Sequence, residues 1–309
     1  MLFIRFYRIV LAFTLITCTL FLDSASANEK TIAFAQDTMA NDFRKAQVFE
    51  VRDAIAKHQE LKFTYSNARG QTSLLIRQIE KFIAAKVNIL IVGTNDADAV
   101  VPVITKAHKQ DIPVIILDRG INGTEYTTFI NSDNIAIGTM GARYIAKRLN
   151  GKGVVLLFEG LQKADVTQLR SKGFLDAISQ HKEIQVLKRT GNYLRKDAIH
   201  AMEKLIAAGI HIDAIFSESD SMLSGVRSAL HRHGIDPKKI IMIGCDYTSE
   251  AQEAIRKGSQ TGSILFPLGG LQTAQTALKI LRGEKVPKHI SIPVKLVTQK
   301  NIDEIAPIF

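Results

Sequence analysis

Cysteine is almost absent from this chain of 309 residues, which contains two cysteines and no tryptophan. Cys18 lies in an N-terminal apolar segment, so only Cys245 remains for the rest of the chain. A single cysteine cannot form an intramolecular disulfide, and an isolated thiol in a core is usually an inert small hydrophobe. We therefore expect the fold to be stabilised by its core, which 46% hydrophobic residues can supply.

Sequence motifs of enzymes and metal sites are also missing. The chain contains no G-x-x-x-x-G-K-[ST], no H-E-x-x-H, no C-x-x-C and no G-x-S-x-G. His231 and His233 lie two residues apart on a predicted helix, so they do not share a face. We therefore expect no catalytic residue, no metal and no cofactor, and an enzyme is a disfavoured alternative.

Long runs of like charge are missing as well, although the net charge is +10. No more than two basic residues are adjacent, and the lysines and arginines are scattered over predicted helix faces. Nucleic-acid binding usually requires a concentrated basic patch. We therefore expect a solvated basic surface and no nucleic-acid partner.

The N-terminus carries a 14-residue apolar run from Ile9 to Leu22, which Arg5 and Arg8 precede and the sequence SASA follows. This pattern predicts a cleavable secretory signal peptide over residues 1–27 and hence a periplasmic protein. A transmembrane anchor would need about 20 apolar residues. A lipoprotein would be expected to have a smaller residue than threonine before Cys18. No later run is long enough to span a membrane.

From Thr31 onward, short apolar strands alternate with helices whose apolar residues recur every three or four positions. TIAFA, NILIV, PVIIL, GVVLLF, DAIF and IIMIG are such strands, and a final strand is expected near 290–294. This alternation predicts parallel sheets with helices on both faces. Roughly ten strands are too many for one simple doubly wound sheet, so we expect two similar α/β lobes. A (β/α)8 barrel is the alternative.

Open parallel sheets bind ligands beyond the carboxyl ends of their strands, so the polar residues at those ends are candidate ligand residues. Asp118 and Arg119 directly follow PVIIL and could together bind the vicinal hydroxyls of a sugar, although a structural salt bridge or helix cap is the alternative. For Asp96 and Asp220, helix N-capping is the favoured role, and Ser219 could be a cap or turn residue. Other candidates at strand ends are Gln36, Asp37, Thr94, Asn95, Glu159, Arg170, Glu218, Asp246 and Tyr247.

Several motifs, taken in order, resemble those of the sugar-binding proteins of bacterial ABC importers, the ribose-, galactose- and galactofuranose-binding group. The matching segments are IAFAQDTMANDFRKA, PVIILDRG, NSDN, LRSKGF, GNYLR, SESDSMLSGVRSAL and IGCDYTSEAQEAI. The resemblance implies two doubly wound parallel-sheet lobes joined by three crossover segments. It implies an N-terminal lobe of residues 28–131 plus 264–290, and a C-terminal lobe of residues 132–263 plus 291–309.

The resemblance also implies a sugar site between the lobes. Phe43 and Tyr193 stand where the family places aromatic rings against the apolar face of the sugar, although core packing is the alternative role for both. The full set of implied ligand residues is Gln36, Phe43, Arg44, Asp118, Arg119, Arg170, Tyr193, Ser219 and Asp246.

Two positions depart from the family pattern. Ser219 stands where the family usually has asparagine, and its side chain is shorter. Leu265 and Phe266 stand near a crossover where the family often has glutamine or glutamate. We therefore expect a pentose or a hexose, including furanose forms. A less polar ligand, or a sugar acid held by the arginines, stays open.

The function implied by the resemblance is transport: a monomer captures the sugar, closes its hinge and delivers the sugar to an ABC permease in the inner membrane. The alternative is a sensory receptor whose closed form binds a chemoreceptor or a histidine kinase ectodomain. A sugar-responsive transcription regulator shares the fold, but it would need a helix-turn-helix where the signal peptide lies.

Overall fold

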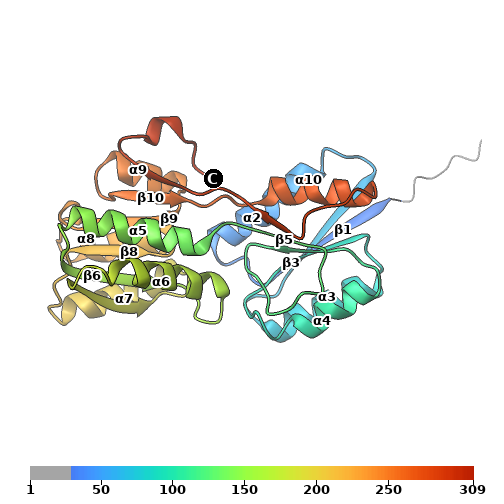
Figure 1. Ribbon diagram of the computed structural model, residues 1–309, viewed down its shortest axis with the longest axis horizontal. Coiled ribbons are helices and arrows are strands. Elements are labelled where there is room, and N and C mark those ends of the chain that lie inside the picture. Colours follow the sequence, from blue (N-terminus) through green and yellow to red (C-terminus); the bar gives the residue numbers. More distant parts are fainter. Residues whose placement is uncertain (1–28) are drawn as a thin grey trace, which may run out of the picture.

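The computed structural model describes residues 29–309, which form two α/β lobes lying side by side (Figure 1). The predicted signal peptide, residues 1–27, lies outside the described residues. Each lobe is built on one six-stranded sheet with helices on both faces. The prediction of two doubly wound lobes is therefore confirmed, and the barrel alternative is wrong.

The first lobe has the strand order β11-β5-β4-β3-β1-β2, and all of its strand pairs are parallel. The strands are β1 (Lys30–Gln36), β2 (Leu61–Asn67), β3 (Ile89–Gly93), β4 (Val114–Leu117), β5 (Thr128–Asn131) and β11 (His289–Ser291). Helices α2 (Asp42–Ile55) and α10 (Gly270–Leu281) cover one face, and α3 (Thr72–Ala84) and α4 (Val101–Lys109) cover the other. Strands β3 and β4 are entirely buried because both of their faces are covered.

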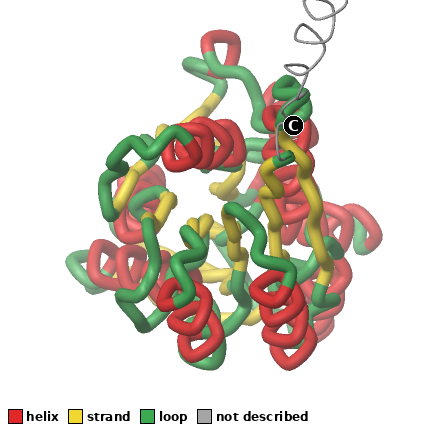
Figure 2. Tube along the Cα trace, turned by 90° about the vertical axis from the view of Figure 1, so that its right-hand side faces the viewer, coloured by secondary structure: helices red, strands yellow, loops and turns green. Residues whose placement is uncertain are grey.

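The second lobe has the order β12-β10-β9-β8-β6-β7, in which only the β10–β12 pair is antiparallel. The strands are β6 (Lys152–Glu159), β7 (Glu183–Thr190), β8 (Ala214–Ser217), β9 (Ile241–Asp246), β10 (Gly262–Leu265) and β12 (Lys295–Thr298). The α-helices are α5 (Asn134–Arg148), α6 (Asp165–Ile178), α7 (Arg195–Ala207), α8 (Asp220–Arg232) and α9 (Ser249–Arg256). Two short 3-10 helices, η1 (Pro237–Lys239) and η2 (Ile302–Glu304), complete it. Figure 2, a view along the long axis of the molecule, shows helices around the outside of the strands.

The chain crosses between the sheets after β5, after β10 and after β11. The predicted boundary at residue 264 falls inside β10, which pairs with β9 and β12 in the second sheet, so the crossing follows Leu265. An apolar run such as SILF does not reveal which sheet it joins. The predicted boundary at residue 290 is one residue early, because β11 ends at Ser291 in the first sheet.

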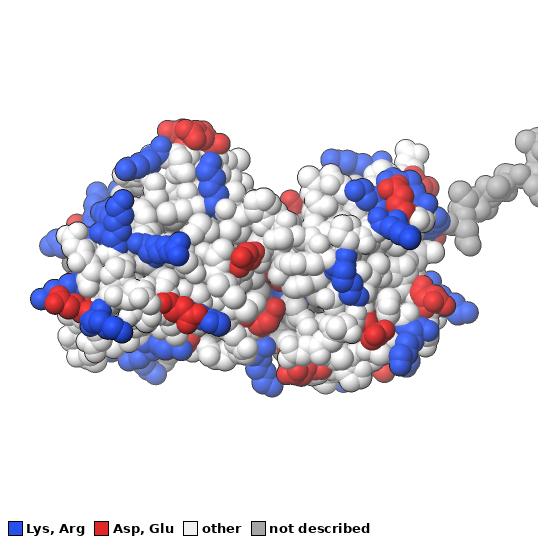
Figure 3. Space-filling model, in the orientation of Figure 1, with Lys and Arg blue, Asp and Glu red and all other residues white. Residues whose placement is uncertain are grey.

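The surface carries basic and acidic side chains that interleave over both lobes. On the face in Figure 3, the basic side chains are densest towards the outer end of the second lobe. Among the helices of residues 29–309, none has the length and apolar character needed to cross a membrane.

Candidate functional site

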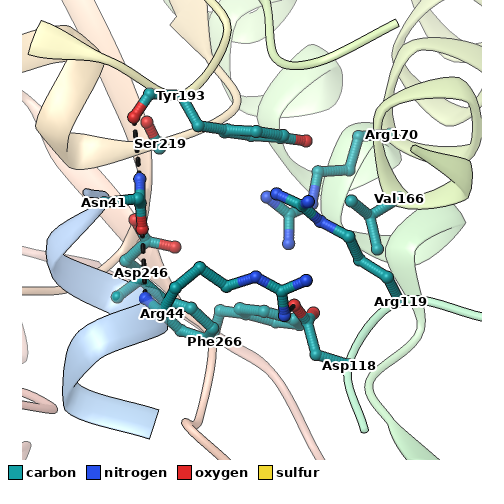
Figure 4. A pocket seen from close by; sticks show the side chains of 11 residues that line it. Asn41, Arg44, Asp118, Arg119, Val166, Arg170, Tyr193, Ser219, Asp246 and Phe266 are labelled. Carbon is teal, nitrogen blue, oxygen red and sulfur yellow. Dashed lines mark hydrogen bonds and ion pairs between the residues drawn. The ribbon is translucent and has the colours of Figure 1, made fainter. Parts of the chain in front are cut away.

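A cavity lies between the lobes, where the carboxyl ends of several strands meet (Figure 4). The lining residues are Asn41, Phe43, Arg44, Asp118, Arg119, Val166, Arg170, Tyr193, Ser219, Asp246 and Phe266. Both lobes contribute to this list, so a ligand in the cavity would contact both.

Eight of the nine predicted ligand residues line the cavity, and Gln36 does not. The side chain of Gln36 is completely buried. Its Nε2 donates to the carbonyl of Arg44 and to Oε1 of Gln47, each at 3.3 Å. Gln36 therefore lies behind the cavity and supports Arg44. The direct contact of the other eight residues with a ligand stays a prediction.

Three lining residues were missed from the sequence: Asn41, Val166 and Phe266. Asn41 has the sequence pattern of an ordinary N-cap, and it does cap α2 by accepting from the N–H of Arg44 at 3.1 Å. Val166 looks like any apolar residue in the first turn of a helix. Phe266 was noted only as a departure from the family pattern, since an aromatic residue after a strand gives no sign of facing a ligand.

Three of the lining residues have a left-handed backbone. The φ angles are 69° at Asp118, 60° at Tyr193 and 113° at Asp246. Residues other than glycine rarely adopt these angles, which cost roughly 1–3 kcal/mol each and persist only where the surrounding structure holds them. The turns direct these side chains out of their strand ends and into the space between the lobes (Figure 4).

The guanidinium group of Arg44 is occupied by protein groups. Its Nε lies 3.1 Å from Oδ1 of Asp37, and its Nη1 donates to Oδ2 of Asp118 at 2.8 Å. Its Nη2 donates to the carbonyl of Thr94 at 2.8 Å. Burial, followed by the charge of Arg119, lowers the pKa of Arg44, and the two aspartates oppose this effect. Arg44 therefore orients Asp118, while its buried Nε lies near Asp37 but makes no hydrogen bond among residues 29–309.

Arg119 and Arg170 are each fixed on one side and open on another. Nη1 of Arg119 donates to Oδ2 of Asp37 at 3.0 Å, while its buried Nε has no hydrogen-bond partner among residues 29–309. Nε of Arg170 donates to Oδ1 of Asn134 at 2.8 Å. Nη1 of Arg170 donates to the carbonyl of Glu218 at 2.7 Å. Both guanidinium groups are thus held in place and keep nitrogen atoms for a ligand.

Asp246 and Asp220 are both buried in the second lobe, but their surroundings differ. The carboxylate of Asp220 accepts from Oγ of Ser263, Nε2 of Gln260 and the N–H of Tyr247, at 2.6, 2.8 and 2.7 Å. Within residues 29–309 the carboxylate of Asp246 accepts from the backbone N–H of Asp220, and no side chain donates to it. Burial, and then the charge of Asp220, raises the pKa of Asp246 well above its usual value. Asp246 is therefore available to ligand hydroxyls.

The helix caps differ in part from the prediction. Ser219, not Asp220, is the N-cap of α8, and its Oγ accepts from the N–H of Met222 at 3.2 Å. The N-cap role favoured for Asp220 is therefore wrong, because its carboxylate holds the Tyr247 turn instead. Asp96 caps the turn before α4, since its Oδ1 accepts from the N–H groups of Asp98 and Ala99.

Aromatic rings lie on two sides of the cavity. Figure 4 shows the rings of Tyr193 and Phe266 on opposite sides of the space. Phe266 stacks on Phe43, with ring centroids 5.2 Å apart and an interplanar angle of 23°. The hydroxyl of Tyr193 lies 2.7 Å from Oγ1 of Thr167. Such a slot suits a ligand with apolar faces and polar edges.

A shared hydroxyl connects two carboxyl groups behind Tyr193. Oγ of Ser171 lies 2.9 Å from Oε1 of Glu159 and 2.9 Å from Oε1 of Glu218. A hydroxyl has one proton to donate, so a protonated carboxyl group would complete the second contact. Lys188 pairs with Glu159 at 2.7 Å, and burial raises the pKa of Glu218 to about 7. Below about pH 7, Glu218 can therefore supply the second proton.

Three polar contacts join the two lobes beside the cavity. Nδ2 of Asn41 donates to the carbonyl of Tyr193 at 2.7 Å, and the N–H of Gly120 donates to Oδ2 of Asp165 at 2.8 Å. A Cβ atom at Gly120 would lie only 2.8 Å from that oxygen, so a side chain there would displace the Asp165 carboxylate. Nζ of Lys163 also lies 3.3 Å from Oδ2 of Asp96 across the same gap.

No cluster of three or more histidine, cysteine or acidic side chains suited to a metal ion occurs within the described residues. The site thus consists of arginine, carboxylate and aromatic side chains from two lobes. This chemistry can bind a small polar molecule, but it contains no nucleophile paired with a base.

Comparisons with known proteins agree with this geometry. Residues 32–285 match a family model described as a periplasmic binding protein domain. The chain is 30% identical over 280 residues to the ribose import binding protein RbsB of Bacillus subtilis, with 90% of each chain covered. Among solved structures it resembles an ABC transporter solute binding protein of Bacillus halodurans with bound myo-inositol. That match has a TM-score of 0.85 and 26% identity, and it covers 91% of this chain and 98% of the other.

A further solved structure is the fructose-binding periplasmic domain of a hybrid two-component system. It matches with a TM-score of 0.84 and 25% identity over 89% of this chain and 92% of the other. All three relatives are described as binding proteins, in agreement with the expectation that this chain is not an enzyme.

Proposed function

Since this chain belongs to the periplasmic binding protein family, we propose that it captures one neutral monosaccharide between its lobes and delivers it to an ABC importer. The observation that carries the proposal is the convergence of eight predicted ligand residues on one cavity. These residues come from strand ends, loops and helices of both lobes, so the fold brings together side chains that are far apart in the sequence.

A neutral polyol fits the open polar groups of the cavity. Oδ1 of Asp118 and the carboxylate of Asp246 can accept hydrogen bonds, and Nε of Arg119 and Nη2 of Arg170 can donate them. A hydroxyl group both donates and accepts, so one sugar hydroxyl can bind an acceptor and a donor together. Eleven side chains surround a small space, which favours a single pentose or hexose over an oligosaccharide.

An anionic ligand fits less well. A sugar acid would bind the two arginines but would also face Asp118 and Asp246, and like charges in a buried site are costly. We therefore favour a neutral sugar over a sugar acid or a sugar phosphate.

Delivery to an importer is favoured over a sensory role. The relative that is 30% identical is named as an import binding protein, whereas the domain of the two-component system is 25% identical. The sensory alternative predicts that the closed form binds a kinase or chemoreceptor ectodomain. Transport predicts that the sugar-loaded protein stimulates the ATPase activity of a reconstituted ABC permease.

A thermal-shift screen followed by calorimetry tests the proposal. The chain without residues 1–27 would be mixed with pentoses, hexoses, cyclitols, sugar acids and sugar phosphates. We expect one neutral sugar, or a few related ones, to raise the melting temperature, because a ligand that binds only the folded state stabilises it. Shifts with anionic sugars alone would contradict the proposal, and so would the absence of any shift.

A further inference from the structure

Tyr247 directly follows Asp246 at the end of β9 but does not line the cavity. Its side chain is completely buried and packs in a small apolar cluster with Ile255, Val297 and Ile302. The backbone is left-handed at both residues of this turn, with φ angles of 113° at Asp246 and 64° at Tyr247. A large side chain rarely adopts such an angle, so the surrounding structure must hold the turn.

Both the hydroxyl group and the backbone of Tyr247 are anchored. The hydroxyl donates to the carbonyl of Ile305 at 3.0 Å and accepts from Nε2 of Gln252 at 2.9 Å. The backbone N–H of Tyr247 donates to Oδ2 of Asp220 at 2.7 Å, and its carbonyl accepts from the N–H of Ile308 at 3.1 Å. These four hydrogen bonds together fix one conformation of the turn.

Two of these partners belong to residues 305–309, and this segment is itself held in place. The backbone N–H and the hydroxyl of Ser249 both donate to the carbonyl oxygen of Phe309, at 2.8 and 2.6 Å. Ile308 packs against the apolar cluster that includes Phe266. The segment therefore provides a fixed support for the turn from the side opposite the cavity lining.

The turn determines where the carboxylate of Asp246 points. Asp246 lines the cavity, and within residues 29–309 its carboxylate accepts from the backbone N–H of Asp220 but from no side chain. Its direction therefore depends on the backbone of the turn. If the anchors of Tyr247 are lost, the turn can relax from its unfavourable angles, and fewer molecules keep the carboxylate in the cavity. The apparent affinity falls in proportion to that fraction.

We propose that Tyr247 is a positioning residue for sugar binding, which holds the carboxylate of Asp246 in the cavity through its contacts with residues 305–309. This inference rests on the proposed function and adds a residue outside the cavity lining. It also gives a reason for a tyrosine at a left-handed position, where glycine would be less strained. The hydroxyl of tyrosine makes two hydrogen bonds that glycine could not make.

A double-mutant cycle tests the inference by isothermal titration calorimetry on the chain without residues 1–27. The probe is the neutral sugar that gives the largest thermal shift in the screen, and each variant is measured well below its melting temperature. We expect Tyr247→Phe to weaken binding about 10-fold, because it removes both hydrogen bonds of the hydroxyl. Asp246→Gly has no carboxylate to position and tolerates a positive φ. In that background, Tyr247→Phe should change the affinity by less than about 2-fold.

Tyr144→Phe is the matched control, because the hydroxyl of Tyr144 accepts from Nη1 of Arg148 on α5 and does not line the cavity. We expect it to leave the affinity unchanged. Unchanged affinity in Tyr247→Phe would overturn the inference, and so would equal losses in both backgrounds of the cycle. In either case the proposed function stands.

Two other outcomes are also decisive. If no neutral sugar binds the unchanged protein, the inference and the proposed function both fail. If Asp246→Gly does not fold or binds too weakly to measure, Asp246→Asn takes its place in the cycle. The inference then requires that Tyr247→Phe weakens binding less in the Asp246→Asn background than in the unchanged protein.

Discussion

Asp220 and Asp246 show how two buried aspartates in one lobe serve different purposes. Asp220 accepts three hydrogen bonds that hold α8, β10 and the turn after β9 together. Asp246 has no side-chain donor beside it in the described residues, and burial raises its pKa well above the usual value. The protein thus carries an unfavourable carboxylate in its cavity, which is expected where ligand hydroxyls complete the site.

We expect Asp246→Asn to raise the melting temperature of the ligand-free protein by a few degrees and to weaken sugar binding by roughly 10–150-fold. The first effect follows from removing a buried charge, and the second from losing hydrogen bonds to a charged acceptor. Thermal unfolding and calorimetry measure the two effects.

Asp220→Asn is the matched control for Asp246→Asn. It should lower the melting temperature, because an amide cannot accept all three hydrogen bonds of the carboxylate. If Asp246→Asn destabilises the ligand-free protein as much as Asp220→Asn does, Asp246 has a structural role and not a binding role.

A second residue-scale prediction concerns Arg170. We expect Arg170→Ala to weaken sugar binding at least about 100-fold, since the residue combines an open nitrogen with its contact over Phe266. Arg227→Ala is the control. Arg227 is also largely buried, but it pairs with Glu250 on the far side of α8 and does not line the cavity. Similar losses of affinity in both variants would contradict the ligand-binding role of Arg170.

The sequence predicted many of the candidate residues, because ligands of parallel sheets bind at the carboxyl ends of strands. It could not show that Arg44 pairs with Asp37, Asp118 and Thr94, since those contacts join separate elements of the fold. The sequence also could not predict that Phe266 lines the cavity. The direction of its side chain depends on where the chain leaves β10, and no local sequence pattern indicates this.

At the scale of elements, β6, β8 and α6 meet behind the cavity. Glu159 ends β6, Glu218 follows β8, and Ser171 on α6 lies between their carboxyl groups. Arg170 and Tyr193 also face Glu218, and Lys188 from β7 faces Glu159. The carboxyl group of Glu218 therefore lies where three elements of the second lobe meet.

This arrangement predicts a pH dependence of stability. The pKa of Glu218 rises from about 4.5 to about 7 on folding. Its contribution to the free energy of unfolding is therefore fully present below pH 4.5 and is lost as the pH rises through 7. The pKa of Asp220 is raised to about 6, so Asp220 also stabilises the folded protein less as the pH rises. We expect Glu218→Gln to flatten the profile of melting temperature between pH 4.5 and pH 7.

The exposed Glu253 on α9 provides the control for this profile, because it pairs only with the neighbouring Lys257. Glu253→Gln should leave the profile nearly unchanged. A slope in Glu218→Gln as steep as in the unchanged protein would show that Glu218 does not hold the proton.

The strand pattern was predicted well where both faces of a sheet are covered, as in β3 and β4. It was wrong at the end of the chain, where one strand was expected near 290–294 and the structure has two. β11 belongs to the first sheet and β12 to the second, and Pro293 lies between them. Proline cannot donate to a ladder, so it separates the two strands.

At the scale of the whole molecule, the position of the lobes depends on a few contacts across the gap. Asp165 at the start of α6 accepts from the N–H of Gly120, and burial raises the pKa of Asp165. The pair of Lys163 and Asp96 is more exposed at its lysine end. Loss of a contact that exists only in the closed form lowers the closed fraction and hence the apparent affinity.

We expect Asp165→Ala to weaken sugar binding more than Lys163→Ala, because surface ion pairs contribute only about 0–1 kcal/mol. Calorimetry would give the affinities, and small-angle X-ray scattering would show a larger radius of gyration for ligand-free Asp165→Ala. Lys172→Ala, which removes an exposed pair within α6, should change neither quantity. Equal affinities for all three variants would mean that these contacts do not control closure.

The three crossings also affect how the protein is made. The first sheet needs β11 and the second needs β12, and both strands follow all the other strands of the two sheets in the sequence. Neither lobe can therefore complete its sheet during synthesis until the other ten strands have been made. For a member of a periplasmic family, this delay keeps the growing polypeptide incomplete, and so easier to thread through an export channel, until its last strands arrive.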